Sequence, residues 1–102
     1  MLQPLDGPSK QYTLSITTAT AVEIKDGANP VLEERKVITL QGDGRFYVYF
    51  ADEDQTPNAA TVAADGFLQY RNAKETYEAS STQAVFIVAA SGTVDVKVAE
   101  RS

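Results

Sequence analysis

The residue types that most often perform chemistry are scarce in this chain of 102 residues. It contains no Cys and no His, which excludes a thiol nucleophile, an imidazole base, a disulfide framework and the usual zinc ligands. Fourteen Asp and Glu residues remain, and a pair of carboxylates can act as general acid and base. Most of them fall in predicted turns or on the polar sides of strands, which indicates solvated surface charge. No Ser lies in a nucleophile-elbow pattern. We therefore expect no catalytic residue, no cofactor and no enzyme.

One cluster of oxygen ligands stands out. Asp52, Glu53 and Asp54 are consecutive, and carboxylates are ligands that calcium prefers. The calcium loop of helix-loop-helix proteins needs Gly at its sixth position and Glu at its twelfth, where this chain has Pro57 and Ala63. A looser surface calcium site with these three candidate ligands stays open as an alternative. The pattern favours a solvated acidic loop without a metal.

Aromatic residues carry more information than the carboxylates. In the run that precedes the acidic loop, Phe46, Val48 and Phe50 face one side of a predicted strand, while Tyr47 and Tyr49 face the other. The first set is typical of a core, and the second predicts cross-strand packing or a protein interface. Tyr pairs also stack on sugar rings. The candidate interface residues, each with burial in the core as its alternative, are Tyr47, Tyr49, Phe67, Tyr70 and Tyr77.

A second predicted strand, residues 85–88, is apolar on both faces. Val85 and Ile87 alternate with Phe86 and Val88, so neither side of the strand is polar. Such a strand lies at the centre of a sandwich or packs partly against another subunit. Both alternatives stay open for a domain of this size.

The elements that must position these side chains are strands. Polar and apolar residues alternate along most of the chain, and turn signals separate the alternating segments. The expected strands cover residues 12–16, 21–25, 37–40, 46–50, 67–70, 85–88 and 93–98. Residues 42–44, Gly-Asp-Gly, and residues 91–92, Ser-Gly, predict hairpins. Helical candidates are weak: residues 32–36, and residues 72–79 with at most one turn. A polar loop is expected over residues 52–58.

The chain length fits one domain. Seven or eight short strands at intervals of about ten residues predict an all-β, antiparallel sandwich over residues 11–102. Residues 1–10, which include Pro4, Gly7 and Pro8, predict a flexible N-terminal arm.

The net charge is −5, and residues 51–80 carry six acidic but only two basic residues. This acidic middle repels phosphate, so we expect no nucleic-acid partner and no binding to an anionic membrane. No apolar run approaches the roughly 20 residues that cross a bilayer, and the N-terminus lacks the pattern of a signal peptide.

Five segments follow one another in an order that is typical of one family. A strand rich in Thr and Ala comes first, then an Arg with an alternating apolar strand, an aromatic strand, a Gly-containing step and a terminal hairpin that ends on an acidic residue. These are residues 17–22, 35–40, 47–50, 65–68 and 85–100. In this order the chain resembles the small all-β virion structural proteins of tailed bacteriophages, over about residues 12–101.

The resemblance implies a sandwich of jelly-roll type that stabilises the head by non-covalent contacts, as capsid decoration, cement or head-fibre proteins do. It implies the major capsid protein or other virion proteins as partners, and a homo-oligomer, with a trimer favoured. The protein would be found in the virion, assembled in the bacterial host cytoplasm. The alternative is a carbohydrate-binding or adaptor module of a tail fibre, neck or baseplate, with exposed Tyr in a groove beside residues 52–54.

Overall fold

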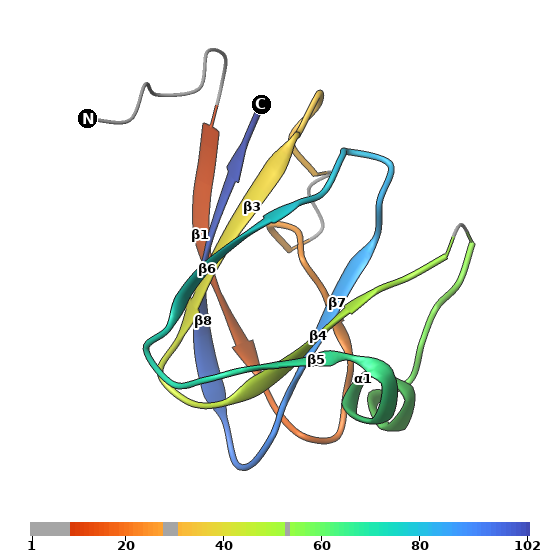
Figure 1. Cartoon of the computed structure of the whole chain (residues 1–102), viewed down its shortest axis with the longest axis vertical. Coiled ribbons are helices and arrows are strands. Elements are labelled where there is room, and N and C mark those ends of the chain that lie inside the picture. The colour runs from red at the N-terminus through yellow and green to blue at the C-terminus, as the bar shows by residue number, and fades with distance from the viewer. Residues whose placement is uncertain (1–8, 28–30, 53) are drawn as a thin grey trace.

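The computed structural model describes residues 9–27, 31–52 and 54–102 (Figure 1). Residues 1–8 of the predicted arm lie outside the described residues. The first strand begins at Ser9, so the last two residues assigned to the arm belong to the sandwich.

Eight strands form two four-stranded antiparallel sheets that pack face to face. Sheet A has the order β1-β8-β3-β6, with bounds Ser9–Ile16, Val94–Arg101, Val37–Gly42 and Lys74–Glu78. Sheet B has the order β2-β7-β4-β5, with bounds Val22–Glu23, Val85–Ala89, Phe46–Phe50 and Phe67–Gln69. One helix, α1 (Ala59–Asp65), lies between β4 and β5 in the sequence. The predicted all-β sandwich is confirmed.

The strand pairs are nested. β4 pairs with β5, β3 with β6, β2 with β7 and β1 with β8. In the sequence, each of these pairs therefore lies between the two strands of the pair named after it. Two further pairings, β3 with β8 and β4 with β7, join these pairs into the two sheets. Eight strands that pair in this nested order and divide into two four-stranded sheets form a jelly roll.

Both predicted hairpins are wrong. The turn at residues 42–44 leads from β3 in sheet A to β4 in sheet B, and the turn at residues 91–92 leads from β7 in sheet B to β8 in sheet A. Each turn reverses the chain between sheets instead of within one. The turn at residues 42–44 is hydrogen-bonded to the start of β8. The Asp43 N–H donates to the Asp95 carbonyl (3.1 Å), and the Asp95 N–H donates to Asp43 Oδ1 (2.9 Å). A turn signal shows where a chain reverses but does not identify the strand's partner.

Neither weak helical candidate forms a helix. Residues 72–79 contain the strand β6, because the backbone pairs with β3 along its whole length. Residues 32–36 form a turn in which Glu34 has a φ of 61° and the Arg35 N–H donates to the Leu32 carbonyl (3.1 Å).

The helix α1 was not predicted. It begins directly after the polar loop, where the Asn58 side chain accepts a hydrogen bond from the Thr61 N–H (2.8 Å) and caps the helix. It contacts β4 and β7 on the outer side of sheet B. In the part of the chain that is described, no helix is long and apolar enough to span a membrane.

Two apolar cores result. The main core lies between the sheets, where alternate residues of both meet, and includes Ile38, Leu40, Phe46, Val48, Ile87 and Val96. The second core lies between the outer face of sheet B and α1 and contains Ala51, Val62, Phe86 and Val88. The strand β7 is therefore apolar on both sides because it lies inside sheet B and contributes to both cores.

Candidate functional site

The predicted interface residues divide into a covered and an exposed group. Tyr47 and Tyr49 are half-buried and pack against the second core. The Tyr49 hydroxyl accepts a hydrogen bond from Gln55 Nε2 (2.9 Å), and Gln55 Oε1 accepts one from the Asp52 N–H (2.9 Å). These contacts tie Tyr49 to the acidic loop, so it serves to hold that loop in place.

Phe67 and Tyr70 belong to the exposed group, with 66% and 63% of their surface accessible. Between them lies Leu68, which is 37% exposed and was not singled out from the sequence. All three follow the helix α1, on or beside the strand β5, which is an edge strand of sheet B. We call Phe67, Leu68 and Tyr70 the β5 surface. Phe67 lies opposite the inward Val48 and Leu68 lies opposite the outward Tyr47, so these two side chains leave the sheet edge on opposite faces. It contains the large exposed hydrophobic residues of the described chain.

The base of the β5 surface is aromatic. The Phe50 ring lies edge-on to Phe67 at 6.5 Å and edge-on to Tyr77 at 5.7 Å, measured between ring centroids. Tyr77, the fifth predicted interface residue, is half-buried and donates its hydroxyl to Gln69 Oε1 (2.9 Å). Burial and the nearby Glu75 carboxylate both raise the pKa of Tyr77.

A buried amide fixes the end of β5. Gln69 Nε2 donates to the Leu40 carbonyl in β3 (2.7 Å) and to the Ala73 carbonyl (2.9 Å). The same side chain accepts from Tyr77, so sheet B is joined to sheet A just below the exposed rings. The β5 surface thus consists of exposed apolar side chains on a segment that the buried Gln69 side chain anchors to sheet A.

The acidic loop is described only in part. Asp52 and Asp54 are exposed, and Glu53 lies outside the described residues. Among the residues that are described, no three Asp or Glu groups come close enough to hold a metal ion.

A buried charge cluster was missed by the sequence analysis. Glu100 occupies an inward position of β8, and its carboxylate contacts the Arg35 guanidinium at 3.6 Å (Oε2 to Nη1). The Leu32 N–H donates to Glu100 Oε2 (2.8 Å), and the Tyr12 hydroxyl donates to Glu100 Oε1. Burial, followed by this hydrogen bond to Glu100, raises the pKa of Tyr12. The sequence did contain a signal for this cluster, because Glu100 follows Val94, Val96 and Val98 at alternate, inward positions of β8.

Arg35 connects the cluster to the loop between β6 and β7. Its Nε donates to the Ala79 carbonyl (2.9 Å), and its Nη2 donates to the carbonyls of Ser80 (2.9 Å) and Gln83 (2.7 Å). Together with Tyr12 and Glu100, this side chain fastens the loop before β3, the loop after β6 and the strands β1 and β8 to one another. The geometry is that of a structural fastener.

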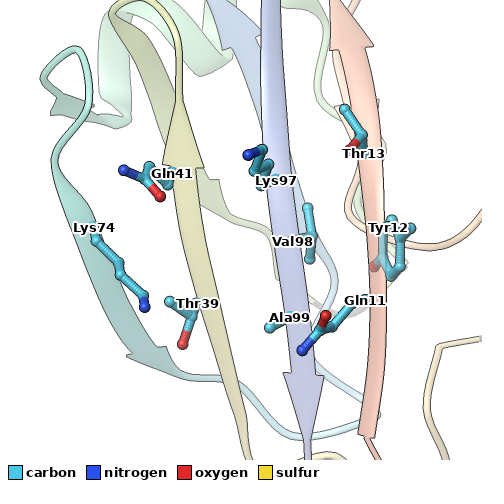
Figure 2. Close-up of a pocket in the computed structure, with 9 residues that line it drawn as sticks. All are labelled: Gln11, Tyr12, Thr13, Thr39, Gln41, Lys74, Lys97, Val98 and Ala99. Atoms are coloured by element: carbon cyan, nitrogen blue, oxygen red, sulfur yellow. The ribbon is translucent and has the colours of Figure 1, made fainter.

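The outer face of sheet A carries a shallow polar hollow of about 370 Å³ (Figure 2). Its lining comes from all four strands of the sheet: Gln11, Tyr12, Thr13, Thr39, Gln41, Lys74, Lys97, Val98 and Ala99. Lys74 extends from β6 toward Thr39, and Gln11 extends from β1 toward Ala99 (Figure 2). No residue of this hollow was singled out from the sequence, because alternating polar residues on a strand look like any solvated face.

Comparison of the chain with protein-family models, with curated proteins and with solved structures finds no match.

Proposed function

We propose that the chain is a structural virion protein of a tailed bacteriophage, a capsid decoration or cement protein that attaches through the β5 surface. The observation that carries the proposal is the exposure of three large apolar side chains, Phe67, Leu68 and Tyr70, along one edge of sheet B. Exposed apolar side chains and unpaired edge strands are a liability for a protein that acts alone. Complete burial of a fully exposed Leu or Phe side chain contributes about 1.5–3 kcal/mol, and each of these side chains gains the share that corresponds to its exposed fraction.

The interior of the sandwich supports a mechanical role. Buried polar groups, namely Arg35, Glu100 and Gln69, join loops and sheets by hydrogen bonds between residues 29 to 68 positions apart in the sequence. Such contacts favour one rigid arrangement, and a rigid module transmits load between the surfaces that it bridges. A cement protein needs this property more than it needs a catalytic group.

The partners that we propose are the major capsid protein or other virion proteins, and a homo-oligomer with a trimer favoured. A closed ring places one β5 surface on each symmetry-related site of a shell. A standard interface of about 800 Å² per partner then repeats over the particle, so modest single contacts suffice.

The experiment is to purify particles from cells that carry the gene for this protein and to measure the chain by quantitative mass spectrometry. We expect many copies on each head, and heads that rupture at a lower temperature when the gene is deleted. Absence of the chain from purified particles contradicts the proposal.

The contribution of the β5 surface is tested by comparing two double variants. Phe67→Ser with Tyr70→Ser removes apolar area and should abolish attachment to particles. Phe67→Leu with Tyr70→Phe keeps most of it and should attach. Equal attachment of the two variants would show that another surface makes the contact.

The alternative function, a carbohydrate-binding or adaptor module of a tail fibre, neck or baseplate, is favoured by one observation, the polar hollow on sheet A. The Tyr groove expected beside residues 52–54 does not supply the site, since Tyr47 and Tyr49 pack beneath α1.

A further inference from the structure

We propose that the hollow on the outer face of sheet A binds a short stretch of an acidic polysaccharide, a glycan whose sugar units carry carboxylates. The proposal concerns a different surface from β5 and does not depend on the virion role.

Strand register sets the geometry of the hollow. Thr13, Lys97, Gln41 and Lys74 are direct neighbours across β1, β8, β3 and β6. The Cα atoms of Lys97 and Lys74 are therefore two strand spacings apart, on the order of 10 Å, and Gln41 lies between them. Two ammonium groups and an amide thus face one strip of surface.

The neighbouring row of residues across the sheet, Gln11, Ala99 and Thr39, forms the floor of the hollow. Ala99 stands between Gln11 and Thr39 in the register, and its methyl group leaves room above the sheet. The Thr39 and Thr76 hydroxyls lie 3.0 Å apart, and Gln41 Nε2 donates to the Asn72 carbonyl (3.2 Å), so part of the polar lining is already oriented.

The charge of the hollow is opposite to that of the chain. No acidic residue lines it, although the chain has a net charge of −5. Neither Lys74 nor Lys97 has an acidic group within ion-pair distance in the described part of the chain. The two ammonium groups are therefore available to an anion.

A second hollow of about 320 Å³ continues the first and shares Thr13, Gln41 and Lys97 with it. Asp43 and Asp95 line this end, and each carboxylate already accepts a hydrogen bond, from the Asp95 N–H and the Ser15 hydroxyl respectively. Carboxylates of this kind accept further hydrogen bonds from hydroxyl groups. The hydroxyl groups that stand beside the carboxylate on each sugar unit supply such donors at this end of the strip.

These features favour a glycan over a nucleic acid. The lining supplies amides and hydroxyls, which pair with sugar hydroxyls. Single-stranded nucleic acids bind largely by stacking their bases on aromatic side chains. The single aromatic residue in the lining, Tyr12, has its hydroxyl engaged by Glu100.

The test is an NMR titration of the intact chain with an oligogalacturonate of six sugars, beside a neutral maltohexaose and a single-stranded oligonucleotide. We expect shifts of the amides of β1, β3, β6 and β8 with the oligogalacturonate, and weaker binding when salt is raised to about 0.5 M. Binding that favours the oligonucleotide, or that is equal for the neutral sugar, overturns the proposal.

Variants locate the site. Lys74→Gln and Lys97→Gln should each weaken binding about fivefold, the upper range for one exposed ion pair. Ala99→Leu should weaken it by filling the floor without changing charge. Lys25→Gln and Lys36→Gln remove the same charge elsewhere and should bind as the unaltered chain does. Equal losses in all four lysine variants would show general charge attraction and contradict a site.

The Phe67→Ser, Tyr70→Ser variant separates the two proposals. It should lose attachment to particles and keep oligogalacturonate binding, so failure of one function leaves the other measurable. Loss of glycan binding in this variant, with its fold intact, would place the glycan on the β5 surface and overturn the assignment to sheet A.

Discussion

The strands β7 and β8 follow one another in the sequence, yet their outward sides have opposite characters. Every residue of β7 is buried, because its outward residues Phe86 and Val88 lie under α1. In β8 the inward residues are buried while the outward ones, such as Asp95 and Lys97, are exposed. The two sheets share one core, but sheet B needs a cover and sheet A does not.

The difference separates two uses of a sheet face. A helix of only seven residues covers part of sheet B, where Tyr47 and Tyr49 are half-buried and Tyr49 is hydrogen-bonded to the acidic loop. On the outer face of sheet A, no described helix or loop covers the polar side chains. Among the described residues, the large exposed hydrophobic side chains are those of the β5 surface. Binding surfaces on this molecule are therefore expected at the edge of one sheet and on the open face of the other.

The largest effect on stability is expected at Glu100, the one charged residue among the buried inward positions of β8. Glu100→Leu leaves the buried Arg35 without its anion and should lower the free energy of unfolding by about 3–5 kcal/mol. Chemical denaturation measures this change. The double variant Arg35→Met, Glu100→Leu removes both charges and should be much more stable than Glu100→Leu; a double variant as unstable as the sum of the singles would contradict a coupled pair.

The cover itself is tested by truncating a side chain beneath α1. Phe86→Ala should lower the free energy of unfolding by about 3 kcal/mol, because it opens a cavity in the second core. Thr39→Ala, the matched change on the open face of sheet A, should alter it by less than about 0.5 kcal/mol. Thermal or denaturant melts of the two variants give the comparison, and equal losses would mean that sheet A is covered as well.

A smaller effect is expected at the junction between the cover and the edge strand. A Cβ at Gly66 would lie 2.4 Å from the Val62 carbonyl oxygen and 2.8 Å from the Val48 carbonyl oxygen. Gly66→Ala must shift α1 or β5 and should cost about 1–3 kcal/mol. Gly27→Ala would meet no atom within 4 Å but has a φ of +60°, so it separates crowding from backbone strain. Amide shifts confined to α1, β4 and β5 in Gly66→Ala would support crowding; an unchanged melt would exclude it.

The smallest effect is a change of the free energy of unfolding with pH, and it involves Tyr12 in β1 and Tyr77 in β6 of sheet A. Tyr12 and Tyr77 have raised pKa values when folded, whereas tyrosines in the unfolded chain ionise near the ordinary value of 10.0. Above pH 10 the unfolded state loses protons that the folded state keeps, so the free energy of unfolding should fall as pH rises. Each tyrosine contributes less than about 1.4 kcal/mol per pH unit, since both are only partly buried.

Denaturation between pH 9 and 11 should show a shallower slope for Tyr12→Phe than for the unaltered chain. Tyr70→Phe, a change at an exposed tyrosine, serves as the control and should leave the slope as it is. A slope that is the same in all three proteins would show that Tyr12 ionises as freely in the folded state as in the unfolded one.

Sequence reasoning reached the fold because alternation is a local property. It assigned β8 and β4 their inward and outward residues, and the number of strands followed. It could not assign partners to the turns at residues 42–44 and 91–92, since the choice of sheet depends on the packing of the whole chain. It missed α1, whose one buried residue, Val62, gives no helical period, although Asn58 supplied a capping signal.

The candidate site was predicted in part. Phe67 and Tyr70 were named from the sequence, and their position at a sheet edge explains why they are exposed. Tyr47 and Tyr49 looked equivalent to them, and only the unpredicted helix makes the difference. Arg35 and Glu100 come together across 65 positions of the sequence, and no spacing rule connects residues so distant.

The nested pairing of strands also sets an order in time. The β4–β5 pair joins residues as close as Val48 and Phe67, whereas β1 has β8 as its partner in sheet A and must wait for Ser9 to meet Arg101. Closing a short loop is faster than closing a long one. We expect the chain to fold from the middle outward, with β1 the last strand to dock. During synthesis on a ribosome, β1 would be the first strand made and the last to find its place.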